Sequence, residues 1–485
     1  LAWLGWFLLE PLPNASSPRQ SITRGLLLLD AIPGLVPGVT FEASLLGQAL
    51  QDLSHVENLP QRLPIVATAA LIALAAVGIG DWILRRARLE AGCGVASRLA
   101  VDYILGTVVL GLATLIVGRF LIPNPWLVRA ALLATAAAGA WGAKFWKWRR
   151  PGFDSGAAAA VAVVAPFVVL MFLGSMLPAV DFDVLEYHLQ GPKEYYQNGR
   201  ISFLPHNVYT NMPFNVEMLH LLGMEAMADW WWGGLVGQSL VALFAPCAAV
   251  LVGSTAYRLG TWRAGLLAAV VYMTTPWIYR LGVIAYVEGP LCGFQAALLW
   301  ALVRGWREEA TTRIRLWGLL GFLAGGAMGC KYTAILPTVL PFGVLCLADA
   351  WRHRTPRLVA VYVLGWAVVM GPWMIKNVID TGNPVYPLAY KVFGGRDWTD
   401  AREGQWNHAH GPRPITGALL QHSLIEVAGR SDWQSPLYAA FAPLAFLNPR
   451  TRRGATALAL YLVWMFASWW LFTHRLDRFW LPMLP

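Results

Sequence analysis

The sequence is dominated by about a dozen long apolar runs, most of them flanked by basic or other polar residues. A helix needs about 20 consecutive apolar residues to cross the hydrocarbon core of a bilayer. Hydrophobic residues make up 57% of the 485 residues and charged residues only 13%, whereas a soluble protein carries about 25% charged residues. We therefore predict an all-α polytopic membrane protein with about 12–14 transmembrane helices. The spans are expected at residues 64–83, 99–122, 126–143, 156–178, 231–256, 264–283, 289–304, 316–330, 333–350, 358–375, 435–448 and 455–472.

The two ends of the chain are also apolar. Residues 1–9 resemble the tail of an earlier span and residues 481–485 the head of a later one, so we expect the C-terminus to be truncated. We divide the chain into an N-terminal extra transmembrane region, residues 1–155 with an outer segment at 10–63, and a transmembrane core at 156–485.

Basic residues gather on one side of the predicted bundle. Roughly half of the 37 Lys and Arg residues fall in six short connecting segments, which the positive-inside rule places in the cytoplasm. The alternation of spans then puts two large polar and aromatic loops, 181–230 and 376–434, on the outer side. The basic residues of the six segments are Arg85, Arg86, Arg88, Lys144, Lys147, Arg149, Arg150, Arg258, Arg263, Arg304, Arg307, Arg313, Arg315, Arg352, Arg354, Arg357, Arg450, Arg452 and Arg453.

Several function classes are excluded by what the sequence lacks. The net charge of +10 would favour nucleic-acid binding in a soluble chain. No nucleic-acid-binding motif is present, and positive-inside loops and an anionic lipid ligand account for the charge. The five cysteines show neither CxxC nor metal-ligand spacing. No Gly-rich phosphate loop, Ser/His/Asp elbow or HExxH occurs, which argues against cytosolic nucleotide chemistry. The sequence therefore requires no cofactor and predicts no metal site, and it leaves a need for a divalent metal undetermined.

The first outer loop opens with an unusual group of polar residues. Asp181, Asp183, Glu186, Tyr187 and His188 directly follow a predicted span. Ionisable side chains are costly in lipid, so we expect them to face a watery cavity. If the segment is helical, three of these side chains, those of residues 183, 186 and 187, share a face. A carboxylate there could act as a general base; alternatively, one caps the next helix and the others pair with basic residues of the loop.

Two further candidates lie at the outer ends of spans. Glu288 stands at the start of a predicted helix, where the helix dipole alone would stabilise it. Lys331, followed by Tyr332, sits in a tight outer turn. The lysine either snorkels to the interface or binds a phosphate as a point charge.

Arg475 and Arg478 lie near the end of the chain, on the predicted outer side. Positive charge there runs against the orientation rule, and an anionic lipid headgroup would explain it. The alternative is an internal ion pair with Asp477 or with an acid of the first loop. The turn at 381–384 favours a structural role, because Gly-Asn-Pro is strong turn chemistry.

These segments together resemble the polyprenyl-phosphate-dependent glycosyltransferases of the GT-C superfamily, such as protein O-mannosyltransferases and lipid A aminoarabinose transferases. The resemblance covers about residues 156–485. Two departures are that Val184 follows Asp183 where many relatives have Glu, and that Glu288 stands where Asp is commoner. The similar segments are 183–189, 193–195, 199–201, 286–288, 329–333, 372–377, 381–384 and 478–482.

The resemblance implies a GT-C-like fold and transfer of a hexosyl or pentosyl group from a polyprenyl-phosphate donor, with inversion, at the outer face. Asp183 would be the base and Glu288 a second catalytic acid residue. Lys331, Arg475 and Arg478 would bind the donor phosphate. The expected substrate-binding residues are Asp181, Glu186, Tyr187, His188, Lys331, Tyr332, Arg475 and Arg478.

The same resemblance places the protein in the bacterial inner (cytoplasmic) membrane with its active face outside. Its partners would be the polyprenyl-phosphate-sugar lipid, an acceptor and membrane complex subunits. Two alternatives stay open: a non-catalytic GT-C-fold scaffold subunit of a larger membrane complex, and a lipid-linked sugar flippase or transporter. The scaffold hypothesis predicts a plugged cavity between the outer loops, and the enzyme hypothesis predicts an open one.

Overall fold

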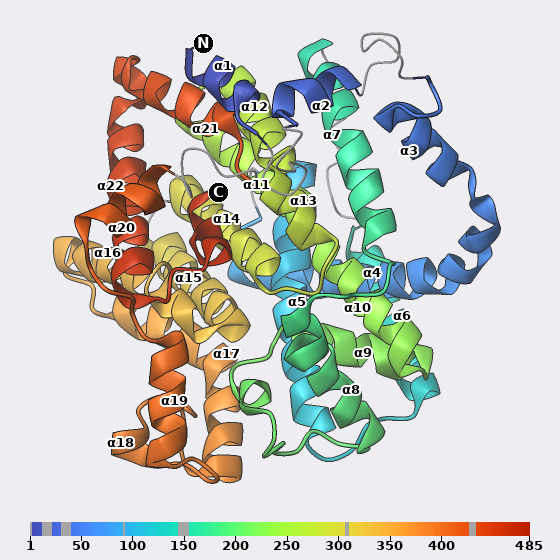
Figure 1. Ribbon diagram of the computed structural model, residues 1–485. Helices are drawn as coiled ribbons and strands as arrows, with labels where there is room; N and C mark the ends of the chain where they lie inside the picture. The colour runs from blue at the N-terminus through green and yellow to red at the C-terminus, as the bar shows by residue number, and fades with distance from the viewer. Residues whose placement is uncertain are drawn as a thin grey trace. The chain divides into compact units, whose positions relative to one another are not determined.

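The computed structural model describes residues 2–11, 22–30, 40–90, 93–143, 155–305, 310–425 and 433–485. Within these ranges the regular structure is helical, apart from one isolated antiparallel bridge between Pro11 and Thr23 (Figure 1). Five basic residues of the predicted cytoplasmic segments, Lys144, Lys147, Arg149, Arg150 and Arg307, lie outside the described residues.

The chain forms two compact units: Leu1–Pro64 with Ile415–Asn448, and Ile65–Pro414 with Pro449–Pro485. The division of the chain near residue 155 stays a prediction. The elements of the first unit are short: α1 (Ala2–Leu9), α2 (Arg24–Asp30), α3 (Leu45–Ser54), η1 (Val56–Asn58), the start of α4, α20 (Gly417–His422), α21 (Pro436–Phe441) and η6 (Ala442–Phe446).

The predicted span at 435–448 lies in this unit and differs from expectation. The structure has α21 followed by the 3-10 helix η6 instead of one continuous helix. Ser435 caps α21 by accepting a hydrogen bond from the Leu437 amide, and Pro443 interrupts the α-helical pattern because it has no N–H to donate.

The second unit contains the longer helices. Its members are α4 (Leu59–Ala87, whose first residues belong to the other unit), α5 (Val95–Gly118), α6 (Pro125–Ala143), α7 (Ser155–Gly174), η2 (Val184–His188), α8 (Gln190–Gln197), η3 (Val208–Asn211), α9 (Glu217–Met227), α10 (Trp230–Ala242), α11 (Phe244–Leu259), α12 (Trp262–Met273), α13 (Pro276–Gly282), α14 (Glu288–Gly305), α15 (Ala310–Cys330), η4 (Tyr332–Ile335), α16 (Val339–His353), α17 (Arg357–Thr381), α18 (Tyr390–Phe393), α19 (Asp400–His410), α22 (Pro449–Phe472) and η7 (Asp477–Met483).

The protein is an all-α polytopic membrane protein, as predicted. Seven helical segments among the described residues are long and apolar enough to cross a membrane. The larger figure of about 12–14 spans stays a prediction. The seven are Leu46–Ala87, Val95–Gly118, Ser155–Gly174, Trp230–Leu259, Tyr332–His353, Arg357–Thr381 and Thr451–Phe472.

The predicted span at 264–283 is broken in two. Helix α12 ends at Met273 and α13 begins at Pro276. The Pro276 ring fits the first position of a helix but not its interior. The hydroxyls of Thr274 and Thr275 donate to carbonyls one turn earlier, at 2.8 and 2.7 Å. Two short helices therefore occupy the place of one predicted span.

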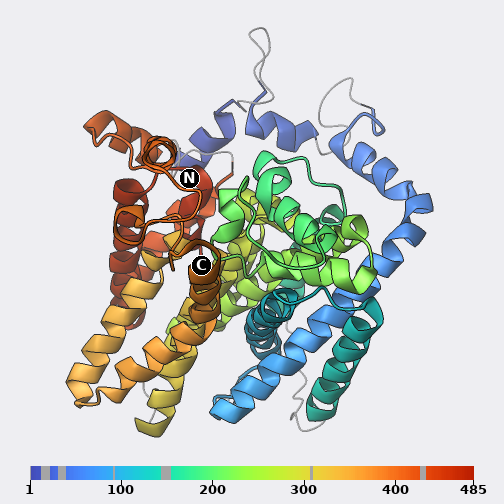
Figure 2. The ribbon, with the colours of Figure 1, turned by 90° about the horizontal axis from the view of Figure 1, so that it is seen from below.

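Small residues allow the helices of the second unit to pack closely, which is typical of membrane bundles. Helices α15 and α17 run side by side with α14 and α16 in the yellow-to-orange part of Figure 2. A Cβ added at Gly321 of α15 would lie 2.0 Å from the carbonyl oxygen of Tyr362 in α17. Gly365 and Gly318 meet in the same way, since a Cβ at Gly365 would lie 2.3 Å from the Gly318 carbonyl oxygen.

Candidate active site

A cavity of about 420 Å³ opens within the second unit. Three parts of the chain that are far apart in sequence form most of it: the first outer loop at 183–188 and 209–217, the turn after α15, and the end of the chain around η7. The second outer loop adds two aromatic side chains, from α19. Its charged, polar and aromatic lining residues are Asp183, Tyr187, His188, Tyr209, Phe214, Glu217, Lys331, Tyr332, Thr333, Trp406, His410, Phe472, Thr473, His474, Arg478 and Phe479.

Tyr187 and His188 of the first outer loop lie in η2, a short π-helix, and Asp183 directly precedes it. Val184 is fully buried and anchors this turn, while Asp183, Tyr187 and His188 line the cavity. The Tyr187 hydroxyl lies 3.5 Å from Asp183 Oδ2, so these two side chains share a face, as expected from their spacing. The local fold therefore brings the predicted acid and its neighbouring ring to one wall.

Four charged groups meet beside this wall. Arg478 donates a hydrogen bond to Asp183 Oδ2, and its Nε lies 3.4 Å from Glu288 Oε1. Lys331 Nζ donates to the same Glu288 oxygen at 3.0 Å. Glu288 is buried and is not among the lining residues, so it holds both cations from behind the cavity wall.

Aromatic rings hold the two cations in place. Lys331 Nζ lies 3.3 Å from the centre of the Phe479 ring, and the Arg478 guanidinium lies 4.5 Å from that of Tyr286. Such cation–π contacts strengthen when they are removed from water. Both cations line the cavity and are positioned to meet an anion there.

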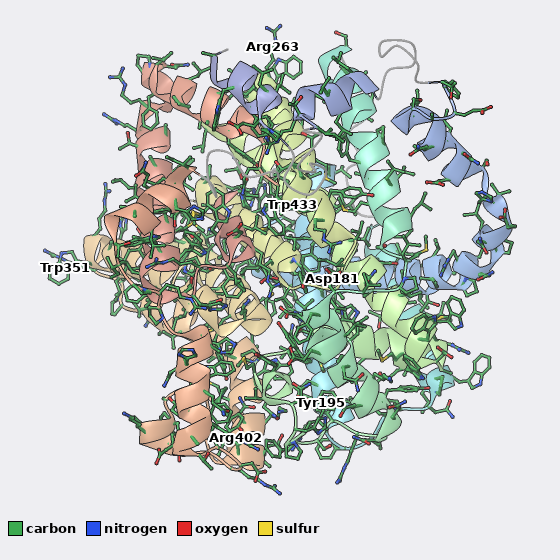
Figure 3. The ribbon with its side chains drawn as sticks, viewed as in Figure 1. Asp181, Tyr195, Arg263, Trp351, Arg402 and Trp433 are labelled. Carbon is green, nitrogen blue, oxygen red and sulfur yellow. The ribbon has the colours of Figure 1, made fainter. Side chains whose placement is uncertain are left out.

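Two acids of the first loop lie away from this cluster. Asp181, labelled in Figure 3, pairs with Arg280 of α13 and does not line the cavity. Glu186 does not line it either, and its backbone carbonyl accepts a hydrogen bond from the Asn207 side chain at 2.8 Å. Burial, and then the charge of Asp183, raise the pKa of Glu186 above its ordinary value.

Arg475 and Tyr332 have different surroundings. The Arg475 guanidinium donates to the backbone oxygens of Trp470, Arg413 and Pro414 at 2.8–3.0 Å, and it is not among the lining residues. Of the three cations predicted on the outer side, the structure thus brings together only Lys331 and Arg478. Tyr332 lines the cavity, and its hydroxyl accepts a hydrogen bond from Asn377 at 3.2 Å.

The geometry of the cavity can now be compared with known families. Residues 226–375 match the family model of the dolichyl-phosphate-mannose-protein mannosyltransferases. This is a family of the GT-C superfamily, so the resemblance to GT-C glycosyltransferases is confirmed. No curated protein and no solved structure matches the chain.

The matched segment runs from the end of α9 through most of α17. It contains Glu288, Lys331 and Tyr332. Asp183 and Arg478 lie outside it, on either side, and join the family segment through the ion pairs of the cavity.

Glu217 is the site residue that sequence reasoning missed. It begins α9 and is buried, with Oε1 2.6 Å from Nδ1 of His188. In sequence it is an acid at the start of an apolar helix, a pattern that the helix dipole explains by itself. Tyr209, Trp406, His410 and His474 also line the cavity and are not among the predicted site residues.

A second charged network holds the first outer loop against the bundle. Asp380 near the end of α17 receives two hydrogen bonds from Arg119, at 2.7 and 3.0 Å, and lies 3.3 Å from Lys376 Nζ. Lys376 also donates to the Asn211 side chain at 3.0 Å. Because Asn211 closely precedes the lining residues 212–214, this network fixes one wall of the cavity.

No group of three or more His, Cys, Asp or Glu side chains suited to a metal ion occurs in the described part of the chain. The chemistry that the lining residues offer is that of two cations, Lys331 and Arg478, the carboxylate of Asp183, and the buried pair of His188 and Glu217.

Proposed function

We propose that the protein is a glycosyltransferase that moves a sugar from a polyprenyl-phosphate donor to an acceptor at the outer face of the membrane, with inversion. One observation carries the proposal: Lys331 and Arg478, from distant parts of the chain, meet beside Asp183 in an open cavity. The match to a family named for a dolichyl-phosphate-mannose donor supports a lipid-linked sugar as the donor class.

The two cations would receive the leaving group. When the bond between the anomeric carbon and the phosphate oxygen breaks, negative charge grows on the polyprenyl phosphate, and preorganised positive groups stabilise it. Arg478 can bind phosphate oxygens with two N–H groups, and Lys331 supplies a compact charge. Glu288 keeps both cations at the cavity wall.

Asp183 would be the general base. The acceptor oxygen attacks the anomeric carbon from the face opposite the phosphate, its proton passes to the Asp183 carboxylate, and the bond to phosphate breaks. The products are the glycosylated acceptor, with inverted configuration, and polyprenyl phosphate. No nucleotide takes part, in keeping with a donor that is already lipid-linked.

We place this reaction at the outer face of a bacterial inner membrane. The support is the gathering of basic residues in the segments opposite the two large loops. The described basic residues on that side include Arg352, beside Trp351, whose ring is 87% exposed and projects away from the end of α16 (Figure 3).

A non-catalytic scaffold subunit is the second candidate. The observation in its favour is that Asp183, Glu288, Lys331 and Arg478 satisfy one another by ion pairs. Such a closed set of charges is also what a structural core of a larger complex would contain. The open volume of about 420 Å³ favours the enzyme, since a scaffold has no need of it.

Donor binding separates the two candidates. Purified protein in lipid nanodiscs would be titrated with undecaprenyl-phosphate mannose, and binding followed by tryptophan fluorescence. The variant Arg478→Ala should weaken binding about tenfold or more, because a hydrogen bond to a charged group contributes about 1.5–3 kcal/mol and 1.4 kcal/mol is a factor of ten. Arg402→Ala, which removes an exposed arginine of α19 outside the cavity, is the matched control and should bind normally.

A wild-type protein that binds no polyprenyl-phosphate lipid would favour the scaffold. Equal binding by the wild type and by Arg478→Ala would show that this arginine serves only its internal partners.

A further inference from the structure

His188 and Glu217 form a buried pair on the wall of the cavity. Their side chains are 4% and 1% exposed, and both residues line the cavity. His188 Nδ1 lies 2.6 Å from Glu217 Oε1, while Glu217 Oε2 is buried without a hydrogen-bond partner among the described residues. Neither residue belongs to the set of four charges described above.

The charge balance around the pair determines its protonation. The two carboxylates and two cations of the ion-paired set already compensate one another, so any net charge on the pair would be buried without compensation. Such a charge is costly. Burial lowers the pKa of His188 well below its usual range and raises that of Glu217 well above its own. Both pKa directions favour the uncharged pair, in which Glu217 donates its proton to Nδ1 of His188.

This state fixes what the pair presents to a ligand. With Nδ1 accepting from Glu217, the remaining ring proton of neutral His188 resides on Nε2. Because His188 is a lining residue, the pair contributes an uncharged N–H group to the cavity wall. The aromatic neighbours extend the same surface: the Tyr187 ring lies 4.1 Å from His188 and stacks on Tyr209 at 4.6 Å.

We propose that His188, positioned by Glu217, forms the sugar subsite of the cavity and selects a donor whose sugar is uncharged. The proposal rests on the proposed function and specifies its substrate class. A hydroxyl of a neutral sugar accepts a hydrogen bond from Nε2, while the stacked rings of Tyr187 and Tyr209 form the apolar wall beside the sugar. A protonated amino sugar would instead bring another donor, and a third cation, next to Lys331 and Arg478.

Three lipids test the subsite: undecaprenyl phosphate, undecaprenyl-phosphate mannose and undecaprenyl-phosphate aminoarabinose, each titrated against protein in nanodiscs. The variant His188→Phe keeps a ring and removes the N–H. It should bind the mannose lipid about tenfold more weakly, the equivalent of one hydrogen bond, and bind the bare lipid phosphate as the wild type does. Retained binding of the bare lipid also shows that the cavity is folded.

Two further variants sharpen the result. Glu217→Gln should bind the mannose lipid nearly as well as the wild type, because its amide N–H still donates to Nδ1 and leaves the proton on Nε2. His206→Ala removes an exposed histidine of the same loop and should change nothing. The wild type should bind the mannose lipid more tightly than the aminoarabinose lipid.

The inference is overturned if His188→Phe weakens both lipids equally or neither, or if the wild type prefers the amino sugar, which would require an ionised Glu217. A wild type that binds none of the three lipids overturns the proposed function and this inference with it. Binding of the mannose lipid that depends on Arg478 but not on His188 overturns the inference alone.

Discussion

Arg478 donates a hydrogen bond to Asp183 across 295 residues of chain. The pair joins the end of the chain to the start of the first outer loop, and Glu288 ties both to the family-matched helices through Arg478. The cavity therefore depends on contacts between segments that no local sequence window contains.

Replacement of Asp183 by Asn should abolish sugar transfer and leave the protein folded. The amide keeps the shape of the side chain but cannot accept the proton, and general-base contributions are about 10²–10⁴-fold in rate. Transfer would be measured with radiolabelled lipid-linked mannose. Glu194→Gln, in the same loop but outside the cavity, is the control and should be active. Wild-type activity in Asp183→Asn would show that Asp183 is not the general base and serves only as a structural partner of Arg478.

The orientation of the loops can be tested by labelling cysteines in intact cells. Asn207 is only 8% exposed and therefore a poor site. The exposed positions Asn198 and Ala401 suit the two outer loops, and His353 the opposite side. Membrane-impermeant maleimide should label cysteines at 198 and 401 from outside, and at 353 only after permeabilisation. The reverse pattern would place the cavity on the cytoplasmic side.

Close packing of α15 on α17 predicts a sharp difference between two glycines. A Cβ at Gly321 would lie 2.0 Å from a backbone oxygen of Tyr362, whereas one at Gly318 would lie 3.9 Å from Val361. Gly321→Ala should therefore lower the free energy of unfolding by about 1–3 kcal/mol, the usual cost of overpacking. Gly318→Ala should be nearly neutral. Thermal unfolding in detergent would compare them, and equal midpoints would mean that the two helices pack less tightly than described.

His474 should make the protein less stable in acid. Burial, followed by the charges of His410, Lys331 and nearby arginines, lowers the pKa of His474 to about 4, against about 6.5 in an unfolded chain. Between these values the unfolded state binds the proton and the folded state does not, so this contribution to stability is full above about pH 6.5 and is lost as the pH falls toward 4. Unfolding midpoints between pH 7 and 4 should drop less for His474→Asn than for the wild type or for His206→Asn. A drop of equal size in all three would assign the acid sensitivity to other groups.

The sequence predicts the helical class well, because apolar run length is a strong local signal. Charge next to apolar runs points to Asp183, Lys331 and Arg478, which the structure brings to one cavity. It cannot tell which of two nearby arginines faces the cavity. In the structure, Arg475 has a positive φ of 59° and Leu476 is extended. This change of direction turns the Arg475 guanidinium to backbone oxygens and leaves Arg478 at the cavity.

Glu217 and the break before Pro276 show two other limits. The helix dipole is a sufficient local explanation for an acid at the start of an apolar helix. The contact of Glu217 with His188 is therefore apparent only in the three-dimensional structure. Pro276 marks the break in the predicted span at 264–283, but the apolar composition of that stretch does not reveal the break. Both features depend on where the chain turns, and apolar periodicity does not encode that.

On the proposed mechanism, the bond between Arg478 and Asp183 sets an order of events. Arg478 already occupies Asp183 Oδ2 with its hydrogen bond, so an acceptor molecule that arrives first competes with the guanidinium for that oxygen. When a lipid phosphate arrives, it competes for the same guanidinium and frees the carboxylate at the moment when a sugar is in place. The donor then unmasks the group that deprotonates its co-substrate, and the kinetics should follow an ordered sequence with the lipid first.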